Sequence, residues 1–345
     1  MLIREEVGSV SIQSLHIPLL AAFISFVMAS LACAFPASEL ISPSPTFTTA
    51  TSAPAATPEE PTVTPIESTP IRPPLAGQIV YTCQLFADGL YDQICVMEPD
   101  GSFQQRLTTN DLADHFYPTL SPDGSSILFS ANLEGPYEIY EQPIGGVPIR
   151  LTVQGHNYAP APSPDGSLVA YTHTDAQGSA LWLMQRSGDQ PQWLIGEAWD
   201  ASWSPDGAWI LHASDRSGTI QLWRVRPDGT DLQRVTDLTG LRGRNDWSSQ
   251  GLLATYAGPS WGREIYAFDI EGQSLRQLTD GGNNLAPSFS PDGDWITYTS
   301  YVDNYLDENG CEIYVQHIET GTRYRLTENS FCDWQPRWGP EINEQ

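Results

Sequence analysis

Short apolar and aromatic runs recur along residues 77–345 at a spacing typical of β-strands separated by turns. The clearest marker is the sequence Ser-Pro-Asp-Gly, which begins at residues 121, 163, 204 and 290, with a divergent Ser-Ser-Gln-Gly at 248. Proline presets φ, aspartate bonds its own backbone and glycine adopts positive φ, so each copy predicts a tight turn between strands. The regular spacing indicates one repeated supersecondary unit.

Three further columns of similar residues accompany these turns. A β-branched or aliphatic run that ends near an aromatic residue marks the second strand of each unit, at Tyr81, Phe129, Tyr171, His212, Tyr256 and Tyr298. An aliphatic-aromatic pair marks the third strand, beginning at Ile94, Ile139, Leu181, Leu222, Ile265 and Ile313. Arg-Leu-Thr or a relative of it marks the fourth, beginning at Arg106, Arg150, Trp193, Arg234, Gln277 and Arg325. Six copies of four short strands predict an all-β fold, a six-bladed β-propeller.

The two ends of the repeated region complement each other. The first predicted strand, Gln78 to Cys83, is a second strand, and the last, Gln335 to Trp338, is a first strand. We therefore expect the last strand to complete the first blade, which would leave no open edge in the ring. Trp203, Trp247, Phe289 and Trp338, which end the first strands, are expected to pack between blades.

These motifs resemble the WD40-like propeller repeat of the TolB C-terminal domain, whose repeats run from Pro-x-Trp-Ser-Pro-Asp-Gly through an Ile-Tyr strand to Arg-Leu-Thr. The resemblance covers almost all of residues 77–340 and is best at residues 201–207 and 287–293. TolB itself carries an α/β domain before its propeller, and this chain has an apolar segment and a linker there, so we expect a TolB-like protein and not TolB. The resemblance implies protein or peptide binding at the propeller face and channel.

The N-terminal 76 residues have a different character. Residues 17–35 carry no charge, and Ala29-Ser30-Leu31-Ala32-Cys33 resembles a lipobox with Ser30 where leucine is favoured. Residues 1–34 are thus predicted to be a lipoprotein signal with Cys33 lipidated, and an uncleaved membrane helix or a cleaved secretory signal remain alternatives. Residues 35–76 are rich in proline, threonine and serine and predict a disordered linker. The propeller, predicted for residues 77–345, would then be exported and tethered to the membrane on its periplasmic or exterior side.

The charge balance limits the partners. The chain has 42 Asp and Glu against 16 Lys and Arg, a formal net charge of −26, and all 16 cations are arginine. A nucleic-acid-tracking surface is therefore excluded, and contact with a membrane is expected through the N-terminal anchor alone. The absence of lysine also excludes a P-loop and a Schiff base.

Four cysteines lie within the predicted propeller. Cys83 and Cys95 flank one hairpin of the first blade, whereas Cys311 begins a third strand and Cys332 precedes the closing strand. Three pairings are possible. We predict Cys83 with Cys95 and Cys311 with Cys332, which an oxidising compartment permits. Buried free thiols are the alternative.

The predicted binding site lies on the loops that lead from each fourth strand to the next first strand, because all six open on one face around the channel. These loops carry aromatic, arginine, histidine and amide side chains, a mixture suited to peptides or sugars. The candidate residues are His115, Tyr117, His156, Tyr158, Trp199, Asp200, Arg244, Asn284, Asp333 and Trp334. The alternative for the aromatic members is packing between blades.

Two chemical possibilities are weak. Asp303, Asp307 and Asn309 crowd one loop and offer oxygen ligands for Ca²⁺, but the regular spacing of a calcium loop is absent. Gly258-Pro259-Ser260-Trp261-Gly262 matches a nucleophile elbow without the following helix that such a serine needs, so we predict a hairpin loop there. A catalytic serine would also need a hydrolase domain after the propeller, and the sequence ends within a few residues of its last predicted strand.

We therefore expect no cofactor and no catalytic residue, and a monomeric, non-enzymatic binding module for an extracytoplasmic protein or peptide. Binding of an extracellular or cell-wall glycan, suggested by Tyr158, Trp199 and Trp334, is the second hypothesis. An enzyme with its site at the channel mouth is the third.

Overall fold

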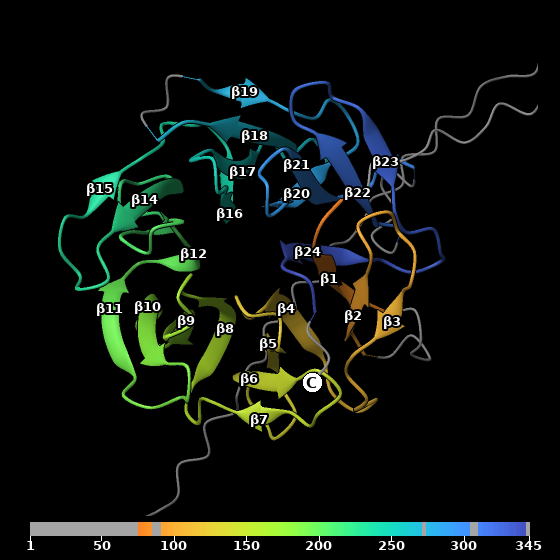
Figure 1. Cartoon of the computed structure of the whole chain (residues 1–345). Helices are drawn as coiled ribbons and strands as arrows, with labels where there is room; N and C mark the ends of the chain where they lie inside the picture. The colour runs from red at the N-terminus through yellow and green to blue at the C-terminus, as the bar shows by residue number, and fades with distance from the viewer. Residues whose placement is uncertain (1–74, 85–90, 271–273, 304–309, 343–345) are drawn as a thin grey trace, which may run out of the picture. The chain divides into compact units, whose positions relative to one another are not determined.

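The computed structural model describes residues 75–84, 91–270, 274–303 and 310–342. Within these ranges the chain forms six antiparallel sheets of four strands each. The sheets are the blades of a ring around a central channel (Figure 1). The predicted six-bladed propeller is confirmed. In the same ranges the structure contains no helix that could span a membrane.

The strands follow the predicted columns closely. Blade 1 consists of β24 (Trp334–Gly339), β1 (Gln78–Cys83), β2 (Gln93–Met97) and β3 (Gln105–Arg106). Blade 2 consists of β4 (His115–Leu120), β5 (Ser126–Ala131), β6 (Glu138–Pro143) and β7 (Ile149–Arg150). Blade 3 consists of β8 (His156–Pro162), β9 (Leu168–Asp175), β10 (Gly178–Gln185) and β11 (Gln192–Gly196).

The second half of the ring repeats this order. Blade 4 consists of β12 (Trp199–Trp203), β13 (Ile210–Ser214), β14 (Gln221–Val225) and β15 (Gln233–Arg234). Blade 5 consists of β16 (Leu241–Trp247), β17 (Leu253–Ala257), β18 (Glu264–Phe268) and β19 (Arg276–Gln277). Blade 6 consists of β20 (Asn284–Phe289), β21 (Trp295–Ser300), β22 (Glu312–His317) and β23 (Arg323–Arg325).

Blade 1 closes the ring with the two ends of the described chain. The antiparallel pair of β24 and β1 places Gln78 opposite Gly339 and Ile79 opposite Trp338, as the sequence predicts (Figure 1). The indole nitrogen of Trp338 also donates a hydrogen bond of 3.0 Å to the carbonyl oxygen of Ala76. Leu75 packs against the adjoining apolar cluster. Leu75 and Ala76, which we assigned to the linker, are therefore part of the propeller.

The Ser-Pro-Asp-Gly turns owe their shape to one set of hydrogen bonds. In the first copy, the Ser121 hydroxyl donates to Asp123 at 2.6 Å and accepts the N–H of Ser126 at 3.0 Å. The N–H of Gly124 donates to the carbonyl of Ser121, and Gly124 has a φ of 67°. The divergent copy keeps the essential part, because Ser248 accepts the N–H of Leu252 and the N–H of Gly251.

The Arg-Leu-Thr motif attaches each short fourth strand to the third strand. In blade 2 the Thr152 hydroxyl accepts the N–H of Ile139 at 2.9 Å and donates to the buried carboxylate of Glu138 at 2.5 Å. Arg150 bonds the carbonyl of Thr152 and the other oxygen of Glu138. The same threonine-to-amide bond recurs in blades 1, 4, 5 and 6. The motif is thus a packing device in which every buried polar atom has a partner.

The apolar core is divided among clusters that join neighbouring blades. Trp203, Phe289 and Trp338 are at most 8% exposed, and Trp247 is partly buried against the cluster of Leu211. These four aromatic residues therefore pack between blades, as expected.

Both predicted disulfides are present. Cys83 pairs with Cys95 within blade 1, and Cys311 pairs with Cys332, with Cα–Cα distances of 5.9 and 4.4 Å. The second bond ties blade 6 to the segment that enters the closing strand. Because disulfides persist in oxidising compartments, they indicate an extracytoplasmic location.

Candidate functional site

A repeated bulge at the start of the inner strands shapes the channel mouth. Five equivalent residues, one each in blades 1, 2, 3, 4 and 6, adopt a positive φ of 51–55°: Tyr117, Ala159, Asp200, Ala286 and Gln335. The pairing register of each of these strands shifts next to that position. Such a bulge bends the strand and redirects its side chains.

Hydroxyl groups of the neighbouring blade hold three of these bulges. The N–H of Asp200 donates to the Thr172 hydroxyl at 3.1 Å, and the N–H of Ala159 donates to Ser130 at 3.2 Å. Gln335 makes the equivalent bond at 3.1 Å to Thr299. The N–H of Tyr117 donates instead to the side-chain oxygen of Gln335 at 2.8 Å. In these four bulges a bond between blades thus replaces a lost ladder bond and holds the residue in place.

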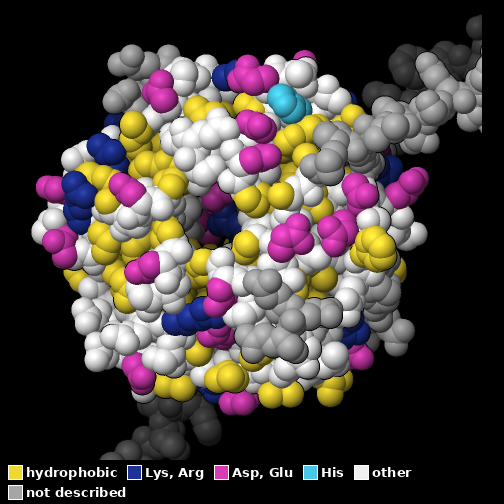
Figure 2. All heavy atoms as spheres, viewed as in Figure 1, with side chains coloured by type: hydrophobic (Ala, Val, Ile, Leu, Met, Phe, Trp, Pro, Cys, Tyr) yellow, Lys and Arg dark blue, Asp and Glu magenta, His cyan; other side chains and the backbone are white. Residues whose placement is uncertain are grey.

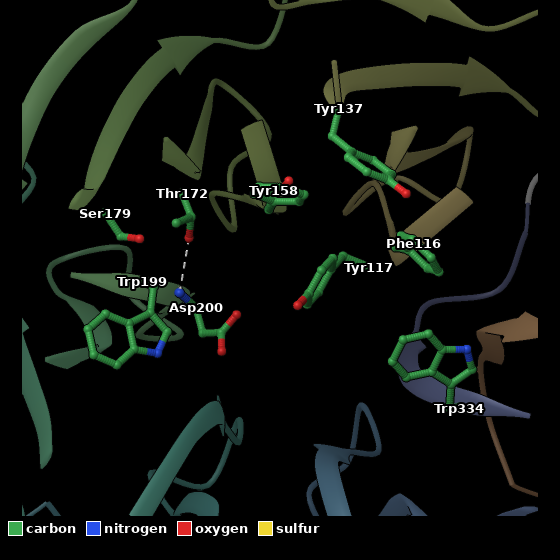
Figure 3. Close-up of a pocket in the computed structure, with 9 residues that line it drawn as sticks. All are labelled: Phe116, Tyr117, Tyr137, Tyr158, Thr172, Ser179, Trp199, Asp200 and Trp334. Carbon is green, nitrogen blue, oxygen red and sulfur yellow. Dashed lines mark hydrogen bonds between the residues drawn. The ribbon is translucent and has the colours of Figure 1, made fainter. Parts of the chain in front are cut away.

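A pocket of about 370 Å³ opens at this mouth and is lined by residues of blades 1, 2, 3 and 4 (Figure 3). Six aromatic residues supply most of its wall: Phe116, Tyr117, Tyr137, Tyr158, Trp199 and Trp334. Asp200, Thr172 and Ser179 supply the polar part.

The aromatic rings hold one another in place. Centroid distances of 5.5 Å from Trp334 to Phe116, 5.7 Å from Phe116 to Tyr137 and 5.4 Å from Tyr137 to Tyr158 form a continuous series. Edge and tilted contacts of this kind are favourable between rings. The rings of the wall therefore support one another.

Carboxylates stand behind two of these rings. The Tyr137 hydroxyl donates to Asp114 at 3.1 Å, and Asp92, near Trp334, accepts a hydrogen bond of 2.8 Å from Gln84. Burial and the neighbouring Asp114 raise the pKa of Tyr137. Burial, supported by Asp114, raises the pKa of Asp92, although the hydrogen bonds that it accepts act in the opposite direction.

Charged side chains lie deeper in the channel, where Figure 2 shows basic and acidic groups within the central hollow. Tyr117 and Asp200 separate the pocket from a cavity of about 10 Å³, which Arg244 and Arg337 also line. Arg337 pairs with Asp246 at 2.8 Å. The Arg244 guanidinium lies 5.0 Å from the Tyr117 ring centroid, and its Nη1 is buried without a hydrogen bond to the described residues.

Burial shifts the pKa values of both charged groups next to Tyr117. It lowers the pKa of Arg244, and the positive charge of Arg337 adds to this effect. It raises the pKa of Asp200, which Arg244 and Arg337 counteract.

The structure brings together six of the ten predicted site residues. Tyr117, Tyr158, Trp199, Asp200 and Trp334 line the pocket, and Arg244 lies beneath it. Their secondary structure differs from the expectation, because they lie within the first four residues of inner strands and not in the connecting loops. The inner strands begin earlier in the chain than predicted, because their pairing with the second strand continues on both sides of the bulge.

Three other candidates lie in the interior, and their predicted exposure on the face is corrected. His115 is 1% exposed beside the carbonyl of Asp92, and burial lowers its pKa to about 4. Asn284 donates to the buried carboxylate of Glu264 at 2.8 Å. Asp333 is fully buried and accepts a hydrogen bond of 2.7 Å from Asn329. Their polarity serves internal networks.

His156 remains exposed at the rim. Its ring stacks at 6.4 Å on Tyr158, whose hydroxyl lies 3.4 Å from Nδ1. It can contact a ligand that enters the pocket.

Four lining residues were absent from the predicted set. Phe116 precedes Tyr117, and Tyr137, Thr172 and Ser179 come from the second and third strands of blades 2 and 3 or the loop between them. Successive strands of a blade are antiparallel, so the hairpins that join second to third strands lie on the same face as the connections from fourth to first strands. This rule could have added residues of those hairpins to the predicted site.

The predicted metal loop lies mostly outside the described residues. Asp307 and Asn309 belong to a segment that the structure does not describe, and the calcium site stays a prediction. Asp303 is engaged by Arg325 at 3.1 Å and by the hydroxyl of Tyr314. The Gly258 to Gly262 segment is a turn between β17 and β18, as predicted, in which Gly262 donates to Pro259.

Six four-stranded blades, the first of which is completed by the C-terminal strand, define a six-bladed β-propeller with an aromatic pocket at one channel mouth. The sequence model of the TolB beta propeller domain matches residues 149–306. An uncharacterized protein of Agrobacterium fabrum, Atu1656, is 31% identical over 206 residues, which cover 53% of this chain and 68% of that protein. The chain belongs to the TolB beta-propeller family.

Two further similarities concern longer proteins. The uncharacterized peptidase YuxL of Bacillus subtilis is 24% identical over 189 residues, which cover 41% of this chain and 29% of the peptidase. The crystal structure of TolB from Acinetobacter baumannii superposes with a TM-score of 0.69 at 22% identity, covering 78% of this chain and 68% of TolB. The latter similarity shows the shared fold.

Proposed function

We propose that this protein is an extracytoplasmic, non-enzymatic binding module that takes a protein or peptide segment into the aromatic pocket. The observation that supports this proposal is the pocket itself, in which six aromatic rings surround one carboxylate at the channel mouth. Large, pre-ordered aromatic surfaces contribute most of the energy in peptide and protein interfaces. A volume of about 370 Å³ is at the lower end of ligand pockets, typically ~300–1,000 Å³.

The test is a titration of the full-length protein with a library of blocked pentapeptides, followed by calorimetry on the peptides retained. The double variant Trp199→Ala/Trp334→Ala removes opposite walls of the pocket and should weaken binding by more than about tenfold. Trp193→Ala is the matched control, since this tryptophan is 60% exposed on the outer strand β11.

The two variants should melt at the same temperature as the parent within a few degrees, so that loss of binding reports the pocket. Equal binding by parent and double variant would place the site elsewhere. Retention of cell-wall or extracellular oligosaccharides in place of every peptide would replace this proposal with the glycan hypothesis.

We further propose that Cys33 carries a lipid that tethers the propeller to the membrane. The proposal rests on the apolar run of residues 17–35 and the small residues before Cys33. Cys33 lies outside the residues that the structure describes. Mass spectrometry of the purified protein should show a diacylglyceryl adduct that Cys33→Ser abolishes, whereas an intact residue 1–34 segment in the mature protein would support an uncleaved helix.

A further inference from the structure

The pocket wall is negative and aromatic, without a basic side chain. Of the nine residues that line it, six are aromatic and Asp200 is the carboxylate. In Figure 3 the Asp200 carboxylate points into the space between Trp199 and Tyr117. An electron-rich ring face attracts cations, and a carboxylate in the same pocket adds a directed, charge-assisted contact.

Asp200 is held through its main chain, which leaves its carboxylate to the pocket. Its N–H donates to Thr172, and its carbonyl accepts from the Asn245 amide at 2.6 Å. Among the described residues, no ion pair or hydrogen bond engages the carboxylate oxygens. A group that donates to this carboxylate must therefore come from solvent or from a ligand.

The carboxylates behind the wall strengthen the same preference. Asp114 accepts from the Tyr137 hydroxyl, and the carboxylate of Asp92 acts together with it at this side of the wall. A hydrogen bond donated to a carboxylate pushes electron density back into the ring, which makes its face more attractive to a cation. The net charge of −26 of the whole chain steers cations toward the mouth over longer distances.

The arginines of the channel lie below this wall. Arg337 is neutralised by Asp246 at 2.8 Å. Arg244 lies under the Tyr117 ring, which separates it from the pocket. Arg244 favours the ionised form of Asp200, which the pocket needs, although burial opposes it.

We propose that the pocket binds a protonated amine or guanidinium, presented by a lysine or arginine side chain of the partner peptide. The alkyl stem lies against Trp199 and Trp334, the cation faces the tyrosine rings, and Asp200 accepts its hydrogen bonds. This inference rests on the proposed function, because it names the group that the peptide inserts.

The test compares four blocked peptides that differ at one central residue: lysine, arginine, acetyl-lysine and glutamate. Calorimetry with the full-length protein should show the lysine or arginine peptide binding at least about tenfold more tightly than acetyl-lysine and glutamate peptides. Lysine amide and arginine amide, titrated alone, separate a free amine ligand from a peptide-borne side chain.

Asp200→Asn should lower the affinity for the cationic peptide by about tenfold while leaving the affinity for the acetyl-lysine peptide unchanged. Asparagine tolerates the positive φ of this position, so the variant keeps the bulge. Asp189→Asn is the matched control for the lost charge. Asp189 is exposed and follows the C-terminal end of β10, whereas Ser179 of the pocket lies at the N-terminal end of that strand.

The outcomes separate this inference from the proposal on which it rests. Peptides that bind regardless of the central charge, lose affinity in Trp199→Ala/Trp334→Ala and keep it in Asp200→Asn would leave the peptide module standing and overturn the cation site. Tightest binding of the glutamate peptide would overturn it in favour of Arg244. Amides that bind as tightly as the peptides would make the ligand a small amine. Failure of every peptide and amide would remove both proposals.

Discussion

Asp333 shows how one buried carboxyl group couples the closing blade to pH. It is fully buried, and its Oδ1 has no hydrogen-bond partner among the described residues. Burial, reinforced by the charge of Glu312 on β22, raises its pKa to about 7. In turn, the negative charge of Asp333 contributes to the raised pKa of Tyr81 on β1. At pH values between about 4 and about 7, Asp333 is therefore protonated in the folded state, whereas an aspartate of the unfolded chain is ionised.

This raised pKa predicts that the folded state loses stability as pH increases from about 4 to about 7, because the native protein binds the extra proton there. Asp333→Asn removes the titration. Between pH 5 and pH 8, the free energy of unfolding of the parent should fall by about 2 kcal/mol relative to that of the variant. Urea denaturation at both pH values measures this difference, and parallel pH profiles for the two proteins would contradict the assignment.

The sequence predicts which residues lie near the channel mouth, but not whether each side chain faces the channel or the interior. Columns of aromatic, histidine and aspartate residues before each turn correctly located Trp199, Asp200 and Trp334 at the channel mouth. The same columns placed His115, Asn284 and Asp333 there too. The one-residue bulge at Tyr117 and its equivalents decides which side chains face the channel, and its hydrogen bonds involve residues of another blade. A repeat pattern within one blade contains no information about that partner.

At the scale of elements, the two-residue fourth strands depend on side chains for their attachment. In β7 only Ile149 and Arg150 pair with β6. The bonds of Thr152 to Ile139 and Glu138 supply what this short ladder lacks. Blade 3 has Trp193-Leu194-Ile195 in place of Arg-Leu-Thr, and there β11 extends over five residues and pairs with the eight-residue β10. In blade 3 a longer backbone ladder thus replaces the hydrogen bonds of the threonine side chain.

Thr152→Val is expected to destabilise the fold by about 1–3 kcal/mol, since Glu138 loses a donor and the Ile139 N–H loses its acceptor inside the blade. Thr320→Val, at an exposed turn, serves as the control and should change stability by less than about 0.5 kcal/mol. Thermal unfolding of the three proteins provides the comparison. Equal melting temperatures for Thr152→Val and the parent would mean that solvent satisfies both groups.

At the scale of the whole molecule, the number of blades and the closure could be derived from the sequence because both depend on counting repeats. The pocket could not be derived fully, since Tyr137 comes from the β5–β6 loop of blade 2, and Thr172 and Ser179 come from two strands of blade 3. The circular arrangement of the blades, and not the spacing of these residues in the sequence, brings them to the same end of the channel.

The disulfide between Cys311 and Cys332 predicts how the ring opens. It closes a loop with a sequence separation of 21 residues between β22 and the entry to β24. Cys311→Ser/Cys332→Ser should lower the free energy of unfolding by about 3 kcal/mol through the entropy of the unfolded chain. The double variant should also expose β24 to proteases before other strands. Uniform cleavage throughout the ring would show instead that the propeller opens as one unit.

The pairing of β24 with β1 also dictates an order of events during synthesis. Val80 and Arg337 are neighbours in the finished sheet although most of the propeller lies between them in the chain. Contacts of such high sequence separation form late and slowly, because a long loop must close first. The emerging chain therefore carries β1 with an unpaired inner edge from the beginning until its last strand arrives. A newly made molecule is most exposed to mispairing with other copies during that interval, when it still has to cross to an oxidising compartment.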